Sequence, residues 1–177
     1  MKFPPGPILD RDIPNLPFFP KGVVVFDRDG TLVEDAGQHN DVKRLVFLPG
    51  AIEAVKFLIS RGFGIAIASN QSGLESEKFT LQQLNEFNSA LKMKISQKCG
   101  GEINLVVTCP HLAISKCNCR KPELGLMEAI RKANLGEIML FVGDSESDRL
   151  TADELSIEFI DVGLGRILEQ IKFWSNK

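Results

Sequence analysis

The sequence has almost no net charge and no long apolar segment, and these two absences exclude several classes of protein. The 21 basic and 23 acidic residues leave a net charge of −2, so the chain has no basic field to hold a nucleic-acid backbone. No apolar run approaches the roughly 20 residues that a membrane span needs. The N-terminus has one lysine and then prolines, unlike a signal peptide. We therefore expect a cytoplasmic globular protein that binds neither nucleic acid nor membrane. The sequence leaves its oligomeric state open, with a monomer favoured.

Cysteine and histidine are also scarce, with four and two copies, yet three of the cysteines and one histidine fall within eleven positions. In a reducing compartment such clustering favours a metal over disulfides. Three thiolates and one imidazole match a closed, tetrahedral, structural zinc site. The alternative is a buried histidine beside unconnected cysteines, and the second histidine, His39, is expected at the surface. The expected zinc ligands are Cys109, His111, Cys117 and Cys119.

Prolines concentrate in the first twenty residues, which hold six of the nine. Proline lacks the amide donor that helices and central strands require. We therefore expect residues 1–21 to form an extended arm that lies on the domain or is partly disordered. Residues 22–177 should form a single domain, because a chain of this length can bury a sizeable core.

From residue 22 onward, short apolar runs alternate with helical patterns. This alternation predicts an α/β fold, in which a central parallel sheet carries helices on both faces. Ligands of such sheets bind at the carboxyl ends of the strands. Strands are expected over residues 23–26, 65–68, 103–107, 139–142 and 159–162, and helices over 51–60, 80–99, 124–133, 147–155 and 165–174.

Two of the predicted strands end in carboxylates. The first leads into Asp27 and Asp29, and the fourth leads into Asp144. A carboxylate can attack phosphorus and form an aspartyl phosphate, and Mg²⁺, which prefers oxygen ligands, can lie between it and the phosphate. An isolated Asp-x-Asp-Gly-Thr is also compatible with a turn and a helix cap, but a second acidic strand end favours the metal site.

Four motifs in this order resemble those of the haloacid dehalogenase (HAD) superfamily. They are residues 23–31 (VVVFDRDGT), 69–73 (SNQSG), 120–122 (RKP) and Gly143-Asp144 with Asp148. The resemblance covers roughly residues 22–163 and implies a Rossmann-like HAD fold. Asp148 is expected either to orient a metal-bound water or to be a plain residue of the helix surface.

The resemblance also implies a role for each matched residue. Asp27 would be the nucleophile, and Asp29 the general acid that later acts as base. Asp27, Asp144 and the backbone carbonyl of Asp29 would hold Mg²⁺. The phosphoryl group would bind Ser69, Asn70, Arg120 and Lys121.

The zinc loop ends in Cys-Asn-Cys-Arg-Lys-Pro and narrows the resemblance to one branch, that of heptose 1,7-bisphosphate phosphatase and histidinol-phosphate phosphatase. Members of this branch lack a large cap domain, and residues 34–48 are too few for one, so we expect a small flap. The zinc would fix the loop that leads into Arg120 and Lys121.

The signals for the substrate conflict. Residues 70–73 and 78–80 resemble the heptose enzyme, whereas the short gap between His111 and Cys117 resembles the histidinol enzyme. Glu75 and Glu77 would repel a second phosphate if they face the site. We expect a small phosphorylated metabolite of the heptose-bisphosphate type, with histidinol phosphate as the alternative. A scaffold without activity and a polynucleotide 3′-phosphatase are less favoured, because the acidic residues are intact and a basic field is absent.

Overall fold

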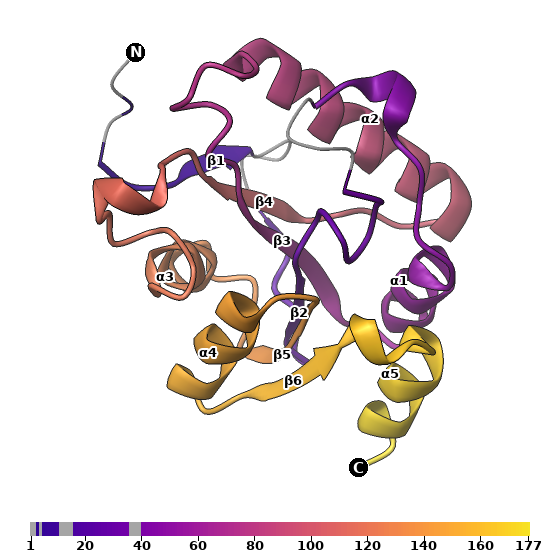
Figure 1. Ribbon diagram of the computed structural model, residues 1–177. Coiled ribbons are helices and arrows are strands. Elements are labelled where there is room, and N and C mark those ends of the chain that lie inside the picture. Colours follow the sequence, from indigo (N-terminus) through magenta and orange to yellow (C-terminus); the bar gives the residue numbers. More distant parts are fainter. Residues whose placement is uncertain (1–2, 4, 11–15, 36–39) are drawn as a thin grey trace.

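The computed structural model describes residues 3, 5–10, 16–35 and 40–177. Its centre is a six-stranded sheet in the order β1-β4-β3-β2-β5-β6 (Figure 1). The five strands from β2 to β6 pair in parallel, as the alternation of strands and helices predicted. The strands are β1 (Ile8–Asp10), β2 (Val23–Phe26), β3 (Gly64–Asn70), β4 (Leu105–Cys109), β5 (Ile138–Gly143) and β6 (Glu158–Asp161).

One further strand, which the sequence did not predict, adds an antiparallel edge to the expected parallel sheet. β1 belongs to the proline-rich arm and pairs antiparallel with β4, with Ile8 opposite Thr108. Asp10 also accepts a hydrogen bond from Lys92 of the neighbouring helix at 2.9 Å. The three residues of β1, Ile8–Asp10, contain no proline. They form an edge strand of the sheet, and one side of an edge strand needs no partner. Within the stretch expected to form an arm, Ile8–Asp10 thus pair with the sheet, while residues 1–2, 4 and 11–15 are outside the described part.

The helices of the described residues cover the two faces of the sheet (Figure 1). The first face carries α1 (Ala51–Ser60), α2 (Leu81–Cys99) and α5 (Ile167–Ser175), and the second carries α3 (Gly125–Lys132) and α4 (Glu146–Glu154). Short 3₁₀ turns lie at η1 (Val42–Arg44), η2 (Ala113–Ser115) and η3 (Val162–Leu164). In the described residues, no helix has the length and apolar character needed to cross a membrane.

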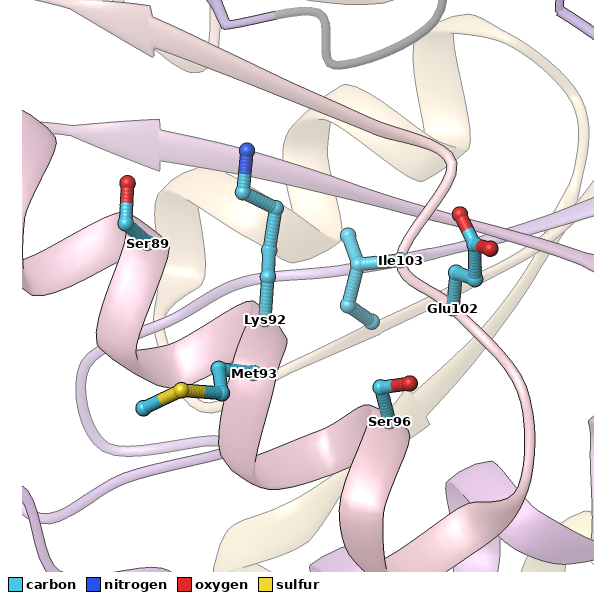
Figure 2. A pocket seen from close by; sticks show the side chains of 6 residues that line it. All are labelled: Ser89, Lys92, Met93, Ser96, Glu102 and Ile103. Carbon is cyan, nitrogen blue, oxygen red and sulfur yellow. The ribbon is translucent and has the colours of Figure 1, made fainter.

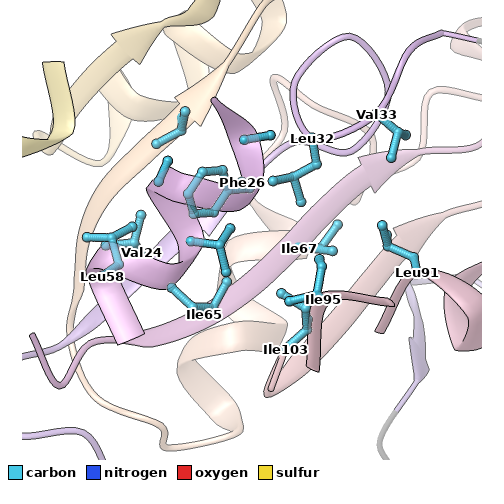
Figure 3. Close-up of a cluster of buried hydrophobic side chains, with 14 of the residues drawn as sticks. Val24, Phe26, Leu32, Val33, Leu58, Ile65, Ile67, Leu91, Ile95 and Ile103 are labelled. Atoms are coloured by element: carbon cyan, nitrogen blue, oxygen red, sulfur yellow. The ribbon is translucent and has the colours of Figure 1, made fainter. Parts of the chain in front are cut away.

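Strand β2, in the middle of the sheet, is buried on both of its faces. Val24 and Phe26 pack into the cluster beneath α1 and α2 (Figure 3), whereas Val23 and Val25 pack against α3. Alternate side chains of a strand point to opposite faces, so an unbroken apolar run is what a strand between two helix layers requires. This burial fixes the place where β2 ends, and therefore where Asp27 begins the loop.

Two helix starts are set by capping boxes. The Thr80 hydroxyl accepts from the backbone amide of Gln83, whose side chain accepts in return from the Thr80 amide. Ser145 and Asp148 form the same arrangement at the start of α4, which satisfies donors that an uncapped helix leaves exposed. The second box was not predicted, and it aims Asp148 toward the sheet.

Candidate active site

Three carboxylates meet at the carboxyl ends of β2 and β5. Asp27 follows β2, Asp144 follows β5, and Asp148 comes from the first turn of α4. Ligand oxygens of all three lie within 4.8 Å of one another. The structure therefore brings together the two aspartates that the sequence placed around one cation, and it adds a third.

The electrostatics of this cluster favour a hard cation. Burial, and to a lesser extent the nearby carboxylates of Asp148 and Asp29, raise the pKa of Asp27 to about 7 against the opposing effect of Lys121. Burial also raises the pKa of Asp144. Crowded carboxylate oxygens are the ligand set that Mg²⁺ prefers, and a bound cation would relieve their mutual repulsion.

Lys121 lies between two of these carboxylates. Its Nζ is 2.6 Å from Asp27 Oδ1 and 2.6 Å from Asp148 Oδ1, and it donates to the Ala68 carbonyl at 2.8 Å. Burial lowers the pKa of Lys121, but Asp27 and Asp148 outweigh that effect and raise it. Lys121 is therefore a buried, fixed positive charge beside the predicted nucleophile, as the neutralisation of phosphoryl oxygens requires.

Asp148 is not a residue of the helix surface, because its side chain is fully buried. One oxygen, Oδ2, accepts from the amide of Ser145 at 3.1 Å and from its hydroxyl at 2.7 Å. The other oxygen faces Lys121. The reading as a surface aspartate is thus wrong, and the role in orienting a metal-bound water stays a prediction.

Asp29 is held by two residues that the sequence analysis did not single out. Arg28 Nε donates to Asp29 Oδ2 at 3.0 Å and Arg28 Nη2 to Oδ1 at 3.1 Å, while Gln71 Nε2 donates to Oδ2 at 2.5 Å. Arg28 is itself anchored on α2 by Asn88 Oδ1 at 3.1 Å and by the ring of Phe87. Both were visible in the sequence, since Arg28 separates the two aspartates and Gln71 belongs to the second motif.

Ser69 and Asn70 end β3 beside the same cluster. Ser69 Oγ accepts from Gln71 Nε2 at 2.8 Å, so the hydroxyl proton remains free to donate elsewhere. The Asn70 side chain forms two hydrogen bonds with the backbone of Lys121. Asn70 Nδ2 donates to the Lys121 carbonyl at 3.2 Å, and Asn70 Oδ1 accepts from the Lys121 amide at 3.0 Å. Asn70 thus fixes the lysine, and its role as a phosphate ligand stays a prediction.

The cysteine–histidine loop forms a second cluster. The four side chains present ligand atoms within 4.8 Å of one another. Cys119 Sγ lies 3.3 Å from both Cys109 Sγ and His111 Nδ1, and Cys117 Sγ lies 3.6 Å from Cys109 Sγ. Tetrahedral zinc with Zn–S bonds of about 2.3 Å would separate its sulfur ligands by about 3.8 Å. The set fits zinc and not the alternative of unconnected cysteines.

Two further contacts connect this loop to its surroundings. Arg120 Nη1 donates to the His111 carbonyl at 3.1 Å. The Glu75 carboxylate accepts from the Leu112 amide and from the Ser115 hydroxyl, and the Leu112 amide lowers the pKa of Glu75. Glu75 is therefore turned toward the zinc loop. The expected repulsion of a second phosphate, which required Glu75 to face the site, does not apply to this residue.

The flap contributes Asn40, whose backbone is left-handed at φ 43° and whose side chain is buried. Asn40 Nδ2 donates to Gln71 Oε1 at 3.1 Å. Among the described residues, Asn40 Oδ1 has no hydrogen-bond donor. His39 and the rest of residues 36–39 lie outside the described part, so the expectation for His39 is not tested.

A pocket between α2 and the segment before β4 is lined by residues other than those of the carboxylate cluster (Figure 2). Its lining contains Lys92, which is paired with Asp10, and none of the carboxylates above. It lies beside Ile103, ahead of the amino end of β4, whereas ligands of parallel sheets bind at the carboxyl ends. We therefore do not take it as the functional site.

The sheet order, the acidic ends of β2 and β5 and the buried lysine together define a HAD-type α/β domain. A family model described as polynucleotide kinase 3 phosphatase matches residues 22–163, and the chain belongs to this family.

Relatives of this chain carry two kinds of name. D-glycero-beta-D-manno-heptose-1,7-bisphosphate 7-phosphatase of Neisseria meningitidis is 37% identical over 135 residues, 74% of this chain and 71% of that protein. Histidine biosynthesis bifunctional protein HisB of Campylobacter jejuni is 32% identical over 146 residues, 80% of this chain and 41% of that longer protein. The crystal structure of D,D-heptose 1.7-bisphosphate phosphatase from B. bronchiseptica, complexed with magnesium and phosphate, has a TM-score of 0.72 at 27% identity and covers 78% of each chain.

Proposed function

We propose that this protein is a magnesium-dependent phosphomonoester hydrolase that acts through an aspartyl phosphate on a small phosphorylated metabolite. The observation that carries the proposal is the meeting of Asp27, Asp144 and Asp148 beside the buried charge of Lys121. A structural relative that holds magnesium and phosphate supports the same chemistry. Mg²⁺ would be held by Asp27, Asp144 and the backbone carbonyl of Asp29, and it supplies positive charge between nucleophile and phosphate.

The residues of this chain divide the reaction into two displacements. In the first, an oxygen of Asp27 attacks phosphorus while Asp29 protonates the leaving oxygen. In the second, Asp29 takes a proton from the water that attacks the aspartyl phosphate, which frees phosphate and restores Asp27. Lys121 and the Ser69 hydroxyl, which Gln71 leaves with a free proton, would stabilise the phosphoryl oxygens.

The cysteine–histidine loop would hold zinc without taking part in these steps, because four protein ligands leave no open position. The loop leads directly from Cys119 into Arg120 and Lys121. Zinc would therefore keep the charged side chains of Arg120 and Lys121 at fixed positions relative to β3.

The substrate we propose is a heptose bisphosphate, from which the 7-phosphate is removed. A relative named as a heptose-bisphosphate phosphatase covers 74% of this chain. The Glu75 carboxylate, which would repel a second phosphate if it faced the site, instead binds the zinc loop. Histidinol phosphate is the second candidate, favoured by the HisB relative and by the short gap between His111 and Cys117.

A specificity profile tests both the reaction and the substrate. Phosphorylated metabolites that include heptose 1,7-bisphosphate, histidinol phosphate and a 3′-phosphorylated oligonucleotide are assayed for phosphate release with Mg²⁺ and with excess chelator. We expect heptose bisphosphate to be turned over fastest, only with Mg²⁺, and Asp27→Asn to be folded and inactive. Full turnover in chelator, or an active Asp27→Asn protein, would reject the mechanism.

A further inference from the structure

Two buried carboxamides form a chain that ends at Asp29: Gln71 contacts Asp29 and Asn40 contacts Gln71, and neither takes part in the two displacements described above. Gln71 is 5% exposed and Asn40 is 6% exposed. Gln71 uses both of its amide hydrogens, one toward Asp29 Oδ2 at 2.5 Å and one toward Ser69 Oγ at 2.8 Å. One side chain thus contacts the predicted general acid and a predicted phosphate ligand at the same time.

Asn40 determines which way the Gln71 amide faces. Because Asn40 Nδ2 donates to Gln71 Oε1 at 3.1 Å, the amino group of Gln71 must lie on the side of Asp29 and Ser69. The reversed amide would place Oε1 against the Asp29 carboxylate, where two acceptors would face each other. The flap residue therefore fixes an orientation inside the site.

The contacts of Asp29 distinguish its two oxygens. Oδ2 accepts from Arg28 Nε and from Gln71 Nε2, whereas Oδ1 accepts only from Arg28 Nη2, at 3.1 Å, among the described residues. Oδ2 is thus occupied, and Oδ1 retains a lone pair for a transferable proton. Proton transfer needs a carboxyl group held in one orientation relative to the reacting oxygen.

We propose that Gln71 is a positioning residue for proton transfer by Asp29, and that Asn40 positions Gln71. This inference rests on the proposed function, because it assumes that Asp29 is the acid and base. As the bond from Asp27 to phosphorus forms and the ester P–O bond breaks, the proton of Asp29 Oδ1 passes to the leaving alkoxide. In the second displacement the water oxygen bonds to phosphorus, the bond from Asp27 to phosphorus breaks and Oδ1 takes the water proton, so that ester and water yield alcohol and phosphate.

The test compares two leaving groups. An alkoxide leaves poorly unless it is protonated, whereas nitrophenolate is a stable anion that needs no acid. The value of kcat/KM includes the steps up to loss of the leaving group. The kcat/KM value is measured with heptose 1,7-bisphosphate and with p-nitrophenyl phosphate. If histidinol phosphate is the better substrate, it replaces heptose 1,7-bisphosphate, because it is also the ester of a primary alcohol.

The variants are Gln71→Leu, which removes both donors at similar volume, and Asn40→Ala. We expect Gln71→Leu to lower the ratio of alkyl to nitrophenyl kcat/KM by about tenfold, a fraction of what a general acid contributes. Asn40→Ala acts one hydrogen bond further away and should lower the ratio by about threefold. Gln82→Leu is the control and should leave the ratio unchanged, because Gln82 is exposed on α2 and, among the described residues, its side chain hydrogen-bonds only to Glu86.

The outcomes separate this inference from the proposed function. An equal loss for both substrates would assign Gln71 a structural role, and an unchanged or increased ratio would show that its contact does not position Asp29; either result overturns the inference. If Gln71→Leu does not fold by circular dichroism, the ratio for Asn40→Ala decides alone. An active Asp27→Asn protein would instead reject the proposed function itself.

Discussion

Gly30 offers a direct way to displace a predicted metal ligand without replacing it. Its φ is +80°, and a Cβ built there would lie 2.2 Å from Asp144 Oδ2, a distance at which the carboxylate must move. Asp144 also accepts a hydrogen bond from the hydroxyl of Thr31 at 3.1 Å. Gly30→Ala should therefore strain the backbone, break this hydrogen bond and shift Asp144 from the cation site, while every carboxylate of the site is kept.

The magnitude follows from two separate costs. A left-handed backbone costs an alanine about 1 kcal/mol, and loss of the Thr31 hydrogen bond adds about 1 kcal/mol. Gly100→Ala is the matched control, because its φ is +71° and nothing lies within 4 Å of the added Cβ. We thus expect Gly30→Ala to lower the free energy of unfolding by about 2 kcal/mol and Gly100→Ala by about 1 kcal/mol.

The Mg²⁺ dependence separates displacement of the ligand from simple destabilisation. Both variants are unfolded with urea in chelator, and their phosphate release is titrated with Mg²⁺ at a temperature where both are folded. Gly30→Ala should need at least about tenfold more Mg²⁺ for half-maximal activity, equivalent to about 1.4 kcal/mol of lost binding, whereas Gly100→Ala should match the parent protein. The same Mg²⁺ requirement in all three proteins would refute the placement of Asp144 as a metal ligand.

Two further predictions concern the zinc loop. Metal analysis should find about one zinc per chain. The Cys119→Ser variant should lose most of this zinc and melt several degrees lower, because a structural site contributes its binding energy to folding. A Cys119→Ser protein that lacks zinc and is as stable as the parent would contradict this prediction. Glu75→Ala should lower zinc retention and leave the preference between heptose bisphosphate and histidinol phosphate unchanged, because its carboxylate is bound to Leu112 and Ser115; a changed preference with full zinc content would show that Glu75 faces the substrate.

The sequence predicted those parts of the molecule that local patterns determine. The helix over residues 51–60 has the predicted bounds, because Gly50 and Gly62 enclose one apolar stripe. The five parallel strands follow from apolar runs that only a sheet covered on both faces can bury. The positions of Asp27 and Asp144 follow in turn, because neighbouring parallel strands end at the same edge.

The missed features depend on contacts between distant segments. β1 is three residues long and lies in a proline-rich stretch, so only its pairing with β4 makes it a strand. Asn40 and Gln71 are separated by 31 positions, and no local pattern says that their amides meet. The direction of Glu75 likewise depends on where the zinc loop folds back against the end of β3.

Asp148 joins the folding of a helix to the charge of the site. Its two oxygens have different partners, the start of α4 on one side and Lys121 on the other. A change of side-chain length at this position must therefore disturb both, because one carboxylate supplies the oxygens that contact the helix start and the lysine. We expect position 148 to tolerate very little variation for this reason, although its side chain need not touch a substrate at all.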